Sequence, residues 1–287
     1  MFKTRLLSGV VLVLIALFVF RAGGYWLAAI LFLISLIGFK ELTGALDVAG
    51  SGEAAAQENK VACDFKKWNG LEIAGVLGIT AYYAILTFAK NDTLQWLCIV
   101  AVFMAVMLIY VVRFPKYHAS QVTGAFFSFI YAPFMLSYIY LTRMNPQGIF
   151  MVWLILISSW GCDTCAYVVG MLIGKKKIFP VLSPKKSLEG CIGGIVGAAL
   201  LGGLYGHFFV EAAFPDQTVK WLLAFICAVG AAASQVGDLA ASAIKRNHKI
   251  KDYGTLIPGH GGIMDRFDSV IVTAPMIYFL SSLLLHF

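Results

Sequence analysis

The chain has 287 residues, of which 60% are hydrophobic and 13% are charged. Soluble domains are about 45–50% apolar and about 25% charged, so this composition excludes an ordinary soluble domain. The formal net charge of +7 would suit a nucleic-acid partner. The basic residues are placed as membrane topology requires, however, and we predict that the protein binds no nucleic acid.

The first 24 residues combine basic residues with an apolar core, as a signal peptide does. No convincing small-x-small cleavage site follows, so we predict that this stretch is an uncleaved first membrane span. Further apolar blocks, each about as long as a bilayer is thick, predict an all-α, polytopic integral membrane protein with about nine transmembrane helices. The later spans are predicted at residues 25–42, 71–89, 94–112, 122–141, 149–173, 191–210, 219–236 and 269–285.

The basic residues predict the orientation of these spans. With the N-terminus inside, only Arg21, Lys90, Arg143 and Lys220 lie outside, and the other 18 of the 22 basic residues lie inside. The positive-inside rule therefore predicts an N-in, C-out protein of the cell (inner) membrane. We predict one membrane domain over residues 1–287. Residues 1–150 would form a scaffold and lipid groove, and residues 151–287 would carry the catalytic segments on the cytoplasmic side.

Polar residues are concentrated between Ser242 and Asp268. On a helix, Asp238, Ser242 and Lys245 would share one face, because they are spaced at i, i+4 and i+7. Asp265 and Asp268 are three residues apart, close enough on a helical turn to hold one divalent cation.

A glycine-rich run at residues 258–262 lies between these two groups, and its backbone can approach a ligand closely. Acidic pairs, cationic side chains and a bare backbone together favour a site for a nucleotide and Mg²⁺. The alternative is a loop that is charged only because it is exposed to water.

The segment resembles the signature of the CDP-diacylglycerol synthases, or phosphatidate cytidylyltransferases. We find no departure from that pattern, and a match of so many residues in order is far more specific than a lone glycine motif. The matching residues are Ser242, Ile244, Lys245, Arg246, Lys251, Asp252, Gly254, Ile257, Pro258, His260, Gly261, Gly262, Ile263, Asp265, Arg266, Phe267 and Asp268.

Two further blocks are similar to the same family. Residues 183–190 resemble its SPKK-(S/T)-x-E-G block, so we predict that Lys185, Lys186 and Ser187 bind substrate phosphates. Lysines 175–177 are explained by membrane topology alone. Residues 163–170 resemble its Asp-x-x-Ala-Tyr-x-x-Gly block, which favours a place in the site for Asp163 and Tyr167. A carboxylate in an apolar helix usually faces a polar interior, and a neutral structural role for Asp163 is the alternative.

The resemblance implies the transfer of a cytidylyl group from CTP to phosphatidic acid, in phospholipid biosynthesis. It also implies a homodimer among membrane lipids. Asp238, Asp265 and Asp268 would hold Mg²⁺, with room for a second cation. The predicted groups that bind or stabilise the substrates are Ser242, Lys245, Arg246, His260, Gly261, Gly262 and Arg266.

Other functions are less favoured. A related CTP-dependent enzyme could act on another lipid, such as an isoprenoid. A transporter could use Asp163 and Asp238 as an ion path, but the chain shows no internal repeat of the kind that transporters have. Cys162 and Cys165 have the spacing of redox and zinc sites, yet no second Cys/His pair lies near them in the sequence.

Overall fold

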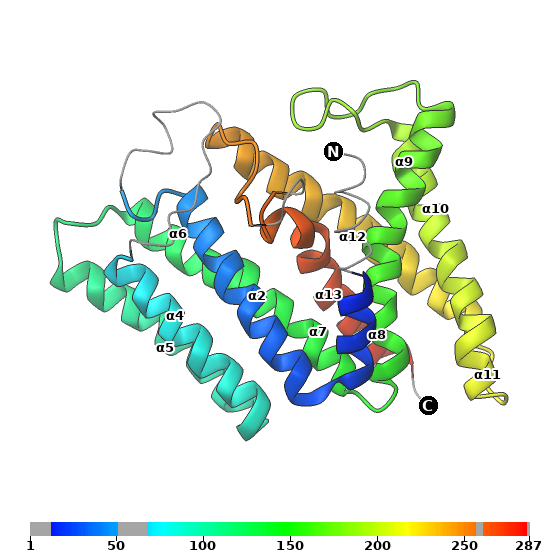
Figure 1. Ribbon diagram of the computed structural model, residues 1–287, viewed down its shortest axis with the longest axis horizontal. Coiled ribbons are helices and arrows are strands. Elements are labelled where there is room, and N and C mark those ends of the chain that lie inside the picture. Colours follow the sequence, from blue (N-terminus) through cyan, green and yellow to red (C-terminus); the bar gives the residue numbers. More distant parts are fainter. Residues whose placement is uncertain (1–12, 51–67, 257–260, 286–287) are drawn as a thin grey trace. The chain divides into compact units, whose positions relative to one another are not determined.

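The computed structural model describes residues 13–50, 68–256 and 261–285, and these residues are almost wholly helical (Figure 1). Short π-helical segments, which take a wider turn, follow α4, α6, α8 and α10. The α-helices are α2 (Gly24–Ala45), α4 (Gly70–Ala84), α5 (Asp92–Val112), α6 (Ala119–Phe129), α7 (Met135–Met144), α8 (Gly148–Leu156), α9 (Cys162–Ile173), α10 (Leu188–Tyr205), α11 (Glu211–Ala213), α12 (Lys220–Asn247) and α13 (Met264–Leu284).

Within the described residues, eight continuous helices are long and apolar enough to cross a membrane. They correspond in order to the predicted second to ninth spans, which confirms the prediction of an all-α polytopic membrane protein. A shorter apolar helix, Val13–Ala22, covers the end of the predicted first span. The earlier part of that span lies outside the described residues.

Local side-chain chemistry explains where several helices begin or widen. The Asn69 side chain accepts from the backbone N–H of Glu72, and the Glu72 side chain accepts from the backbone N–H of Asn69, which together cap α4. Ser187 caps α10 by accepting from the N–H of Gly190 at 3.2 Å. Pro133 lies in the π-helical segment after α6, where its missing N–H fits a change in hydrogen bonding.

The chain forms two compact units. The first contains Met1–Tyr140 and Ile244–Arg266, and the second contains Leu141–Ala243 and Phe267–Phe287. Consequently α12 and α13 each contribute residues to both units. The single membrane domain with halves 1–150 and 151–287 stays a prediction.

A buried ion pair joins α2 to α4 in the core of the first unit. Lys40 Nζ lies 2.8 Å from Glu72 Oε1, and the hydroxyl of Thr43 donates to the same oxygen at 2.9 Å. Each charge is therefore both paired and hydrogen-bonded, as a buried charge requires. The buried apolar residues of the first unit include Phe39, Leu42, Leu71, Ile79, Tyr82 and Phe129.

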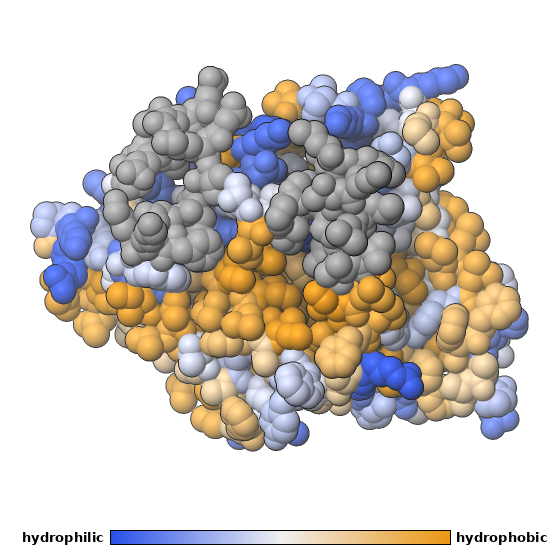
Figure 2. Space-filling view, viewed as in Figure 1, coloured by the Kyte–Doolittle hydropathy of each residue, from blue (hydrophilic) through white to orange (hydrophobic). Residues whose placement is uncertain are grey.

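In the second unit, α9 and α10 lie side by side (Figure 1). Glycines on α10 make this close approach possible: a Cβ on Gly194 would lie 2.9 Å from Cys162 Sγ, and one on Gly197 would lie 2.5 Å from Cys165 Sγ. The opposite face of α10 exposes apolar side chains, in keeping with a lipid environment (Figure 2). That face includes Ile192, Val196, Leu200 and Leu204.

We expect Gly194→Leu to destabilise the second unit by about 1–3 kcal/mol, because the added side chain overpacks the contact with α9. The measurement is the thermal unfolding midpoint of the purified protein in lipid nanodiscs. Leu200→Val is the matched control, since Leu200 is on the same helix and 64% exposed. Equal midpoints for the Gly194 variant and the parent protein would contradict this account of the packing.

Candidate active site

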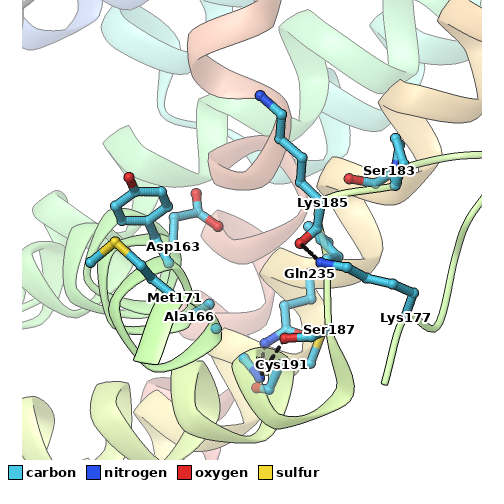
Figure 3. Close-up of a pocket in the computed structure, with 14 residues that line it drawn as sticks. Asp163, Ala166, Met171, Lys177, Ser183, Lys185, Ser187, Cys191 and Gln235 are labelled. Atoms are coloured by element: carbon cyan, nitrogen blue, oxygen red, sulfur yellow. Dashed lines mark hydrogen bonds between the residues drawn. The ribbon is translucent and has the colours of Figure 1, made fainter. Parts of the chain in front are cut away.

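A cavity of about 510 Å³ opens in the second unit between α9 and the loop that follows it (Figure 3). The α9 wall and the loop wall face each other across it, with Asp163 on one side and Lys185 on the other. The residues that line the cavity are Asp163, Ala166, Tyr167, Gly170, Met171, Lys177, Ser183, Pro184, Lys185, Lys186, Ser187, Gly190, Cys191 and Gln235.

The α9 wall is mostly apolar, and Asp163 is its one charged group among the residues that line the cavity. The structure places both predicted residues of this helix, Asp163 and Tyr167, on the wall. Tyr167 is 70% exposed and Met171 is 65% exposed, so large apolar surface is available beside the polar groups. This wall can therefore receive a molecule that is polar at one end and apolar at the other.

The opposite wall is the lysine-rich loop, residues 174–187, whose ends are tied together. The Glu189 carboxylate accepts from the backbone N–H groups of Lys175 at 3.0 Å and of Lys176 at 3.2 Å. Lys177 Nζ donates to the carbonyl of Lys185 at 3.0 Å. Lys177 was expected to serve topology alone, and the structure adds that it lines the cavity.

Lys186 connects this loop to α12 through an ion pair with Asp238. Burial lowers the pKa of Lys186, but Asp238, Asp163 and Cys191 together raise it by more, so the net pKa lies above the ordinary value for lysine. The ammonium group is therefore charged at neutral pH. The Lys186 and Asp238 side chains are 21% and 27% exposed, while the Nζ atom of Lys186 is itself buried beside Asp238.

The floor of the cavity joins the two sequence blocks through their glycines. A Cβ on Gly170 would lie 3.2 Å from Ser187 Oγ and 3.6 Å from Gly190 Cα. A Cβ on Gly190 would lie 2.9 Å from the carbonyl oxygen of Ala166. The absence of side chains at both positions thus lets Ser187 lie against α9.

The sequence analysis did not single out Gln235, which also lines the cavity. Its amide donates to the carbonyl of Cys191 at 2.8 Å and to Cys162 Sγ at 3.4 Å. A polar residue in an apolar span was the available signal. Cys162 and Cys165 are free thiols. They pack against α10, which gives the CxxC spacing a structural explanation.

In the first unit, Asp265 accepts hydrogen bonds from the signature loop, by which we mean the described residues 248–256 and 261–263. Its Oδ2 accepts from the backbone N–H groups of Tyr253 at 2.8 Å and Gly262 at 3.0 Å. Its Oδ1 accepts from Lys245 Nζ at 2.8 Å, and the side chain is 3% exposed. Gly261 adopts φ +83°, where glycine is favoured, and a Cβ there would lie 2.8 Å from Asp265 Oδ2.

Arg266 follows Asp265 and carries an unsatisfied donor. Its Nε is buried without a hydrogen-bond partner in the described part of the chain. Buried donors are normally satisfied, so this group suits an anionic ligand. Arg246, at the end of α12, is exposed. His260 lies outside the described residues.

The remaining predicted residues lie on helices, as their spacing indicated. Asp238, Ser242 and Lys245 all belong to α12, and Ser242 is half-buried. Asp265 and Asp268 both belong to the first turns of α13. Asp268 Oδ1 accepts from the N–H of Ser269 at 2.8 Å.

The candidate metal ligands can be compared with the described geometry. Among residues 13–50, 68–256 and 261–285, no group of three or more His, Cys, Asp or Glu side chains could hold a metal ion. The set of Asp238, Asp265 and Asp268 therefore stays a prediction. Their chemistry fits a hard cation, because they supply carboxylate oxygens. Asp238 and Asp265 each already hold a lysine ammonium group.

Eight of the described helices are long and apolar enough to cross a membrane, and among the described residues one cavity is lined by three lysines and a single carboxylate. This combination suits a membrane-embedded enzyme that handles phosphate esters. The sequence matches the family model described as "Cytidylyltransferase family" over residues 3–284. The chain belongs to this family and is a nucleotidyltransferase.

Curated relatives extend the comparison over most of the chain. A phosphatidate cytidylyltransferase from Staphylococcus epidermidis is 30% identical over 279 residues, covering 96% of this chain and 97% of the relative. One from Staphylococcus haemolyticus is 30% identical over 282 residues, covering 96% and 97%. One from Bacillus subtilis is 36% identical over 146 residues, covering 51% of this chain and 52% of the relative.

Proposed function

We propose that the protein is a phosphatidate cytidylyltransferase, which converts CTP and phosphatidic acid into CDP-diacylglycerol and pyrophosphate for phospholipid biosynthesis. The observation that carries this proposal is the similarity, over 97% of a relative's length, to a protein of that name. The names of these relatives favour phosphatidate over an isoprenoid substrate. The family match favours an enzyme over a transporter.

The cavity of the second unit supports this choice of lipid. A phosphate monoester carries about −1.5 to −2 charges at pH 7, and Lys177, Lys185 and Lys186 supply ammonium groups on the loop wall. Tyr167 and Met171 provide apolar surface on the opposite wall, where the glycerol and acyl portions can lie. We therefore assign the phosphate of phosphatidic acid to this cavity.

The reaction transfers the cytidylyl group in one displacement. An oxygen of the phosphatidate monoester attacks the α-phosphorus of CTP, and a new P–O bond forms. The bond from the α-phosphorus to the oxygen that bridges to the β-phosphate breaks, and pyrophosphate leaves with its electron pair. The monoester is already ionised near neutral pH, since its second pKa is about 6, so no general base is needed.

The polar residues then act by positioning and by neutralising charge. Lys245, Arg246 and Arg266 would stabilise the phosphate oxygens, and the orphaned Nε of Arg266 supports this role. Ser242 would donate a hydrogen bond, and His260 would bind phosphate. Gly261 and Gly262 would let the backbone approach the nucleotide.

Asp238, Asp265 and Asp268 would hold Mg²⁺, and a second cation is part of the proposal. When bound, the cation supplies charge neutralisation at the phosphates. Carboxylate oxygens suit a hard cation such as Mg²⁺, and in the structure Asp238 pairs with Lys186 and Asp265 pairs with Lys245.

We further propose that the enzyme is a homodimer in the cell (inner) membrane, with its catalytic segments on the cytoplasmic side. The orientation is supported by the 18 of 22 basic residues that the predicted topology places inside. The homodimer is supported by the family resemblance alone.

The direct experiment uses the purified full-length protein in phospholipid nanodiscs with CTP labelled in its γ-phosphate. We expect phosphatidic acid to release labelled pyrophosphate and to yield CDP-diacylglycerol. Diacylglycerol and a polyprenyl phosphate are the control acceptors, which test the phosphate group and the lipid class separately. Release with polyprenyl phosphate alone would overturn the proposed substrate.

We expect removal of divalent cations by EDTA to abolish pyrophosphate release and added Mg²⁺ to restore it, because carboxylates and phosphates need a shared cation. The initial rate is measured during titration with Mg²⁺ at constant ionic strength, with Na⁺ as the control cation. Full activity in EDTA would contradict the metal assignment and leave the lipid assignment standing.

A further inference from the structure

A second buried carboxylate contacts the start of α13, and it comes from a distant part of the chain. Glu41 lies on α2, and its side chain reaches the backbone of a segment 222 residues later. Oε1 accepts from the N–H of Ile263 at 3.1 Å, and Oε2 accepts from the N–H of Met264 at 2.8 Å. Glu41 is fully buried, at 0% exposure.

These contacts satisfy groups that the helix cannot satisfy itself. The first N–H groups of a helix lack partners within the helix, and they form its positive end. Glu41 occupies the N–H groups of Ile263 and Met264, while Asp265 occupies those of Tyr253 and Gly262. The two carboxylates thus divide four backbone donors between them.

Two glycines of the signature are explained by the same carboxylate. A Cβ on Gly262 would lie 2.5 Å from Glu41 Oε1, and a Cβ on Gly254 would meet the same oxygen. Any larger residue at either position would therefore displace the Glu41 side chain. Gly254 and Gly262 of the signature therefore lie against Glu41, a residue that is not part of the signature.

The hydrogen bonds of Glu41 leave the Asp265 side chain with a defined orientation. Because Glu41 accepts from the N–H groups of Ile263 and Met264, Asp265 Oδ2 faces the loop backbone and Oδ1 faces Lys245. Without Glu41, the free N–H groups at the start of α13 would compete for the Asp265 carboxylate. The position of Arg266 would also become less fixed. The Arg266 N–H donates to the carbonyl of Ile263, and Ile263 is the residue whose own N–H Glu41 holds.

We propose that Glu41 is a positioning residue for cytidylyl transfer, fixing the signature loop and the start of α13 so that Asp265 and Arg266 are presented correctly. It does this through the backbone and touches neither substrate. The inference rests on the proposed function, because the two residues that Glu41 positions are assigned to that reaction.

The test compares Glu41→Gln with a matched buried acid, Glu72→Gln. Glu72 is also in the first unit, where it accepts from Lys40, Thr43 and the backbone of Asn69. Glutamine keeps the size of Glu41, but its NH₂ group faces a backbone N–H and cannot accept from it. Both variants replace a buried carboxyl group by an amide, so a general loss of stability affects both.

We expect Glu41→Gln to lower kcat by about 10–100-fold, as loss of an orienting outer partner does, with KM for phosphatidic acid changed less than about twofold. Amide hydrogen exchange at Ile263 and Met264 is expected to become faster in this variant only. Glu72→Gln is expected to lower the thermal midpoint and keep kcat, when both are assayed well below their midpoints. Glu41→Asp keeps the carboxyl group on a shorter side chain, and it replaces Glu41→Gln in these measurements if the glutamine variant does not fold.

The outcomes separate the two proposals. No product from the unaltered protein would overturn the proposed function. An active parent with equal kcat in Glu41→Gln would overturn the positioning role alone. An equal loss of kcat in Glu72→Gln would assign the effect to general damage and would also overturn it.

Discussion

Asp265→Asn is expected to lower the rate of pyrophosphate release by about 100-fold to 1,000-fold, the scale of losing one preorganised electrostatic group. Asparagine keeps the shape of the side chain but removes its charge. The carboxylate accepts from Lys245 Nζ and from the backbone of Tyr253 and Gly262. An amide has one oxygen for these donors, so at least one would face the NH₂ group.

The measurement is kcat with saturating CTP and phosphatidic acid in nanodiscs, together with the thermal midpoint. Asp216→Asn is the control, because Asp216 is exposed between α11 and α12. We expect the control to match the parent enzyme. An Asp265→Asn enzyme that folds and keeps the parental rate would show that neither the proposed cation nor the loop needs this charge.

Lys186→Met should weaken the reaction of phosphatidic acid, with kcat/KM for that substrate reduced by about 100-fold. The change removes an ammonium group from the cavity and leaves Asp238 without its ion-pair partner. Methionine preserves most of the length and the apolar stem of lysine. The remaining negative charge of Asp238 would then repel the phosphate.

The reaction is measured at fixed CTP with varied phosphatidic acid, and separately at fixed lipid with varied CTP. Lys176→Met is the matched control from the same loop. Lys176 contacts Glu189 through its backbone N–H, a contact that the substitution keeps. Equal effects of the two substitutions would indicate a general response to membrane charge and would contradict a specific role for Lys186.

Hydropathy predicted the membrane helices because every span needs an apolar stretch about as long as the hydrocarbon layer is thick. The helix boundaries depend on capping hydrogen bonds, which a hydropathy profile does not detect. The span predicted at 191–210 begins earlier, at Leu188, because Ser187 caps it. The span predicted at 269–285 begins at Met264, where Glu41 and Asp265 satisfy the first backbone donors.

The site was predictable where residues lie close in the sequence. The blocks at 163–170 and 183–190 were singled out separately, and the structure brings them to one cavity. Glu41 and Gln235 were missed because their partners are far away along the chain, and a lone acid or amide has no spacing pattern. The roles of Asp238, Asp265 and Asp268 as metal ligands stay predictions.

The length of α12 has a consequence for the depth at which its polar end lies. Its 28 residues rise by about 1.5 Å each, so the helix is about 42 Å long. The hydrocarbon layer is about 30 Å thick, so an upright helix that starts at one edge has about 12 Å left over. That surplus corresponds to about eight residues, which carry Ser242, Lys245 and Arg246. As one continuous helix, α12 would thus hold these side chains at the depth of the phosphate groups of the surrounding lipids.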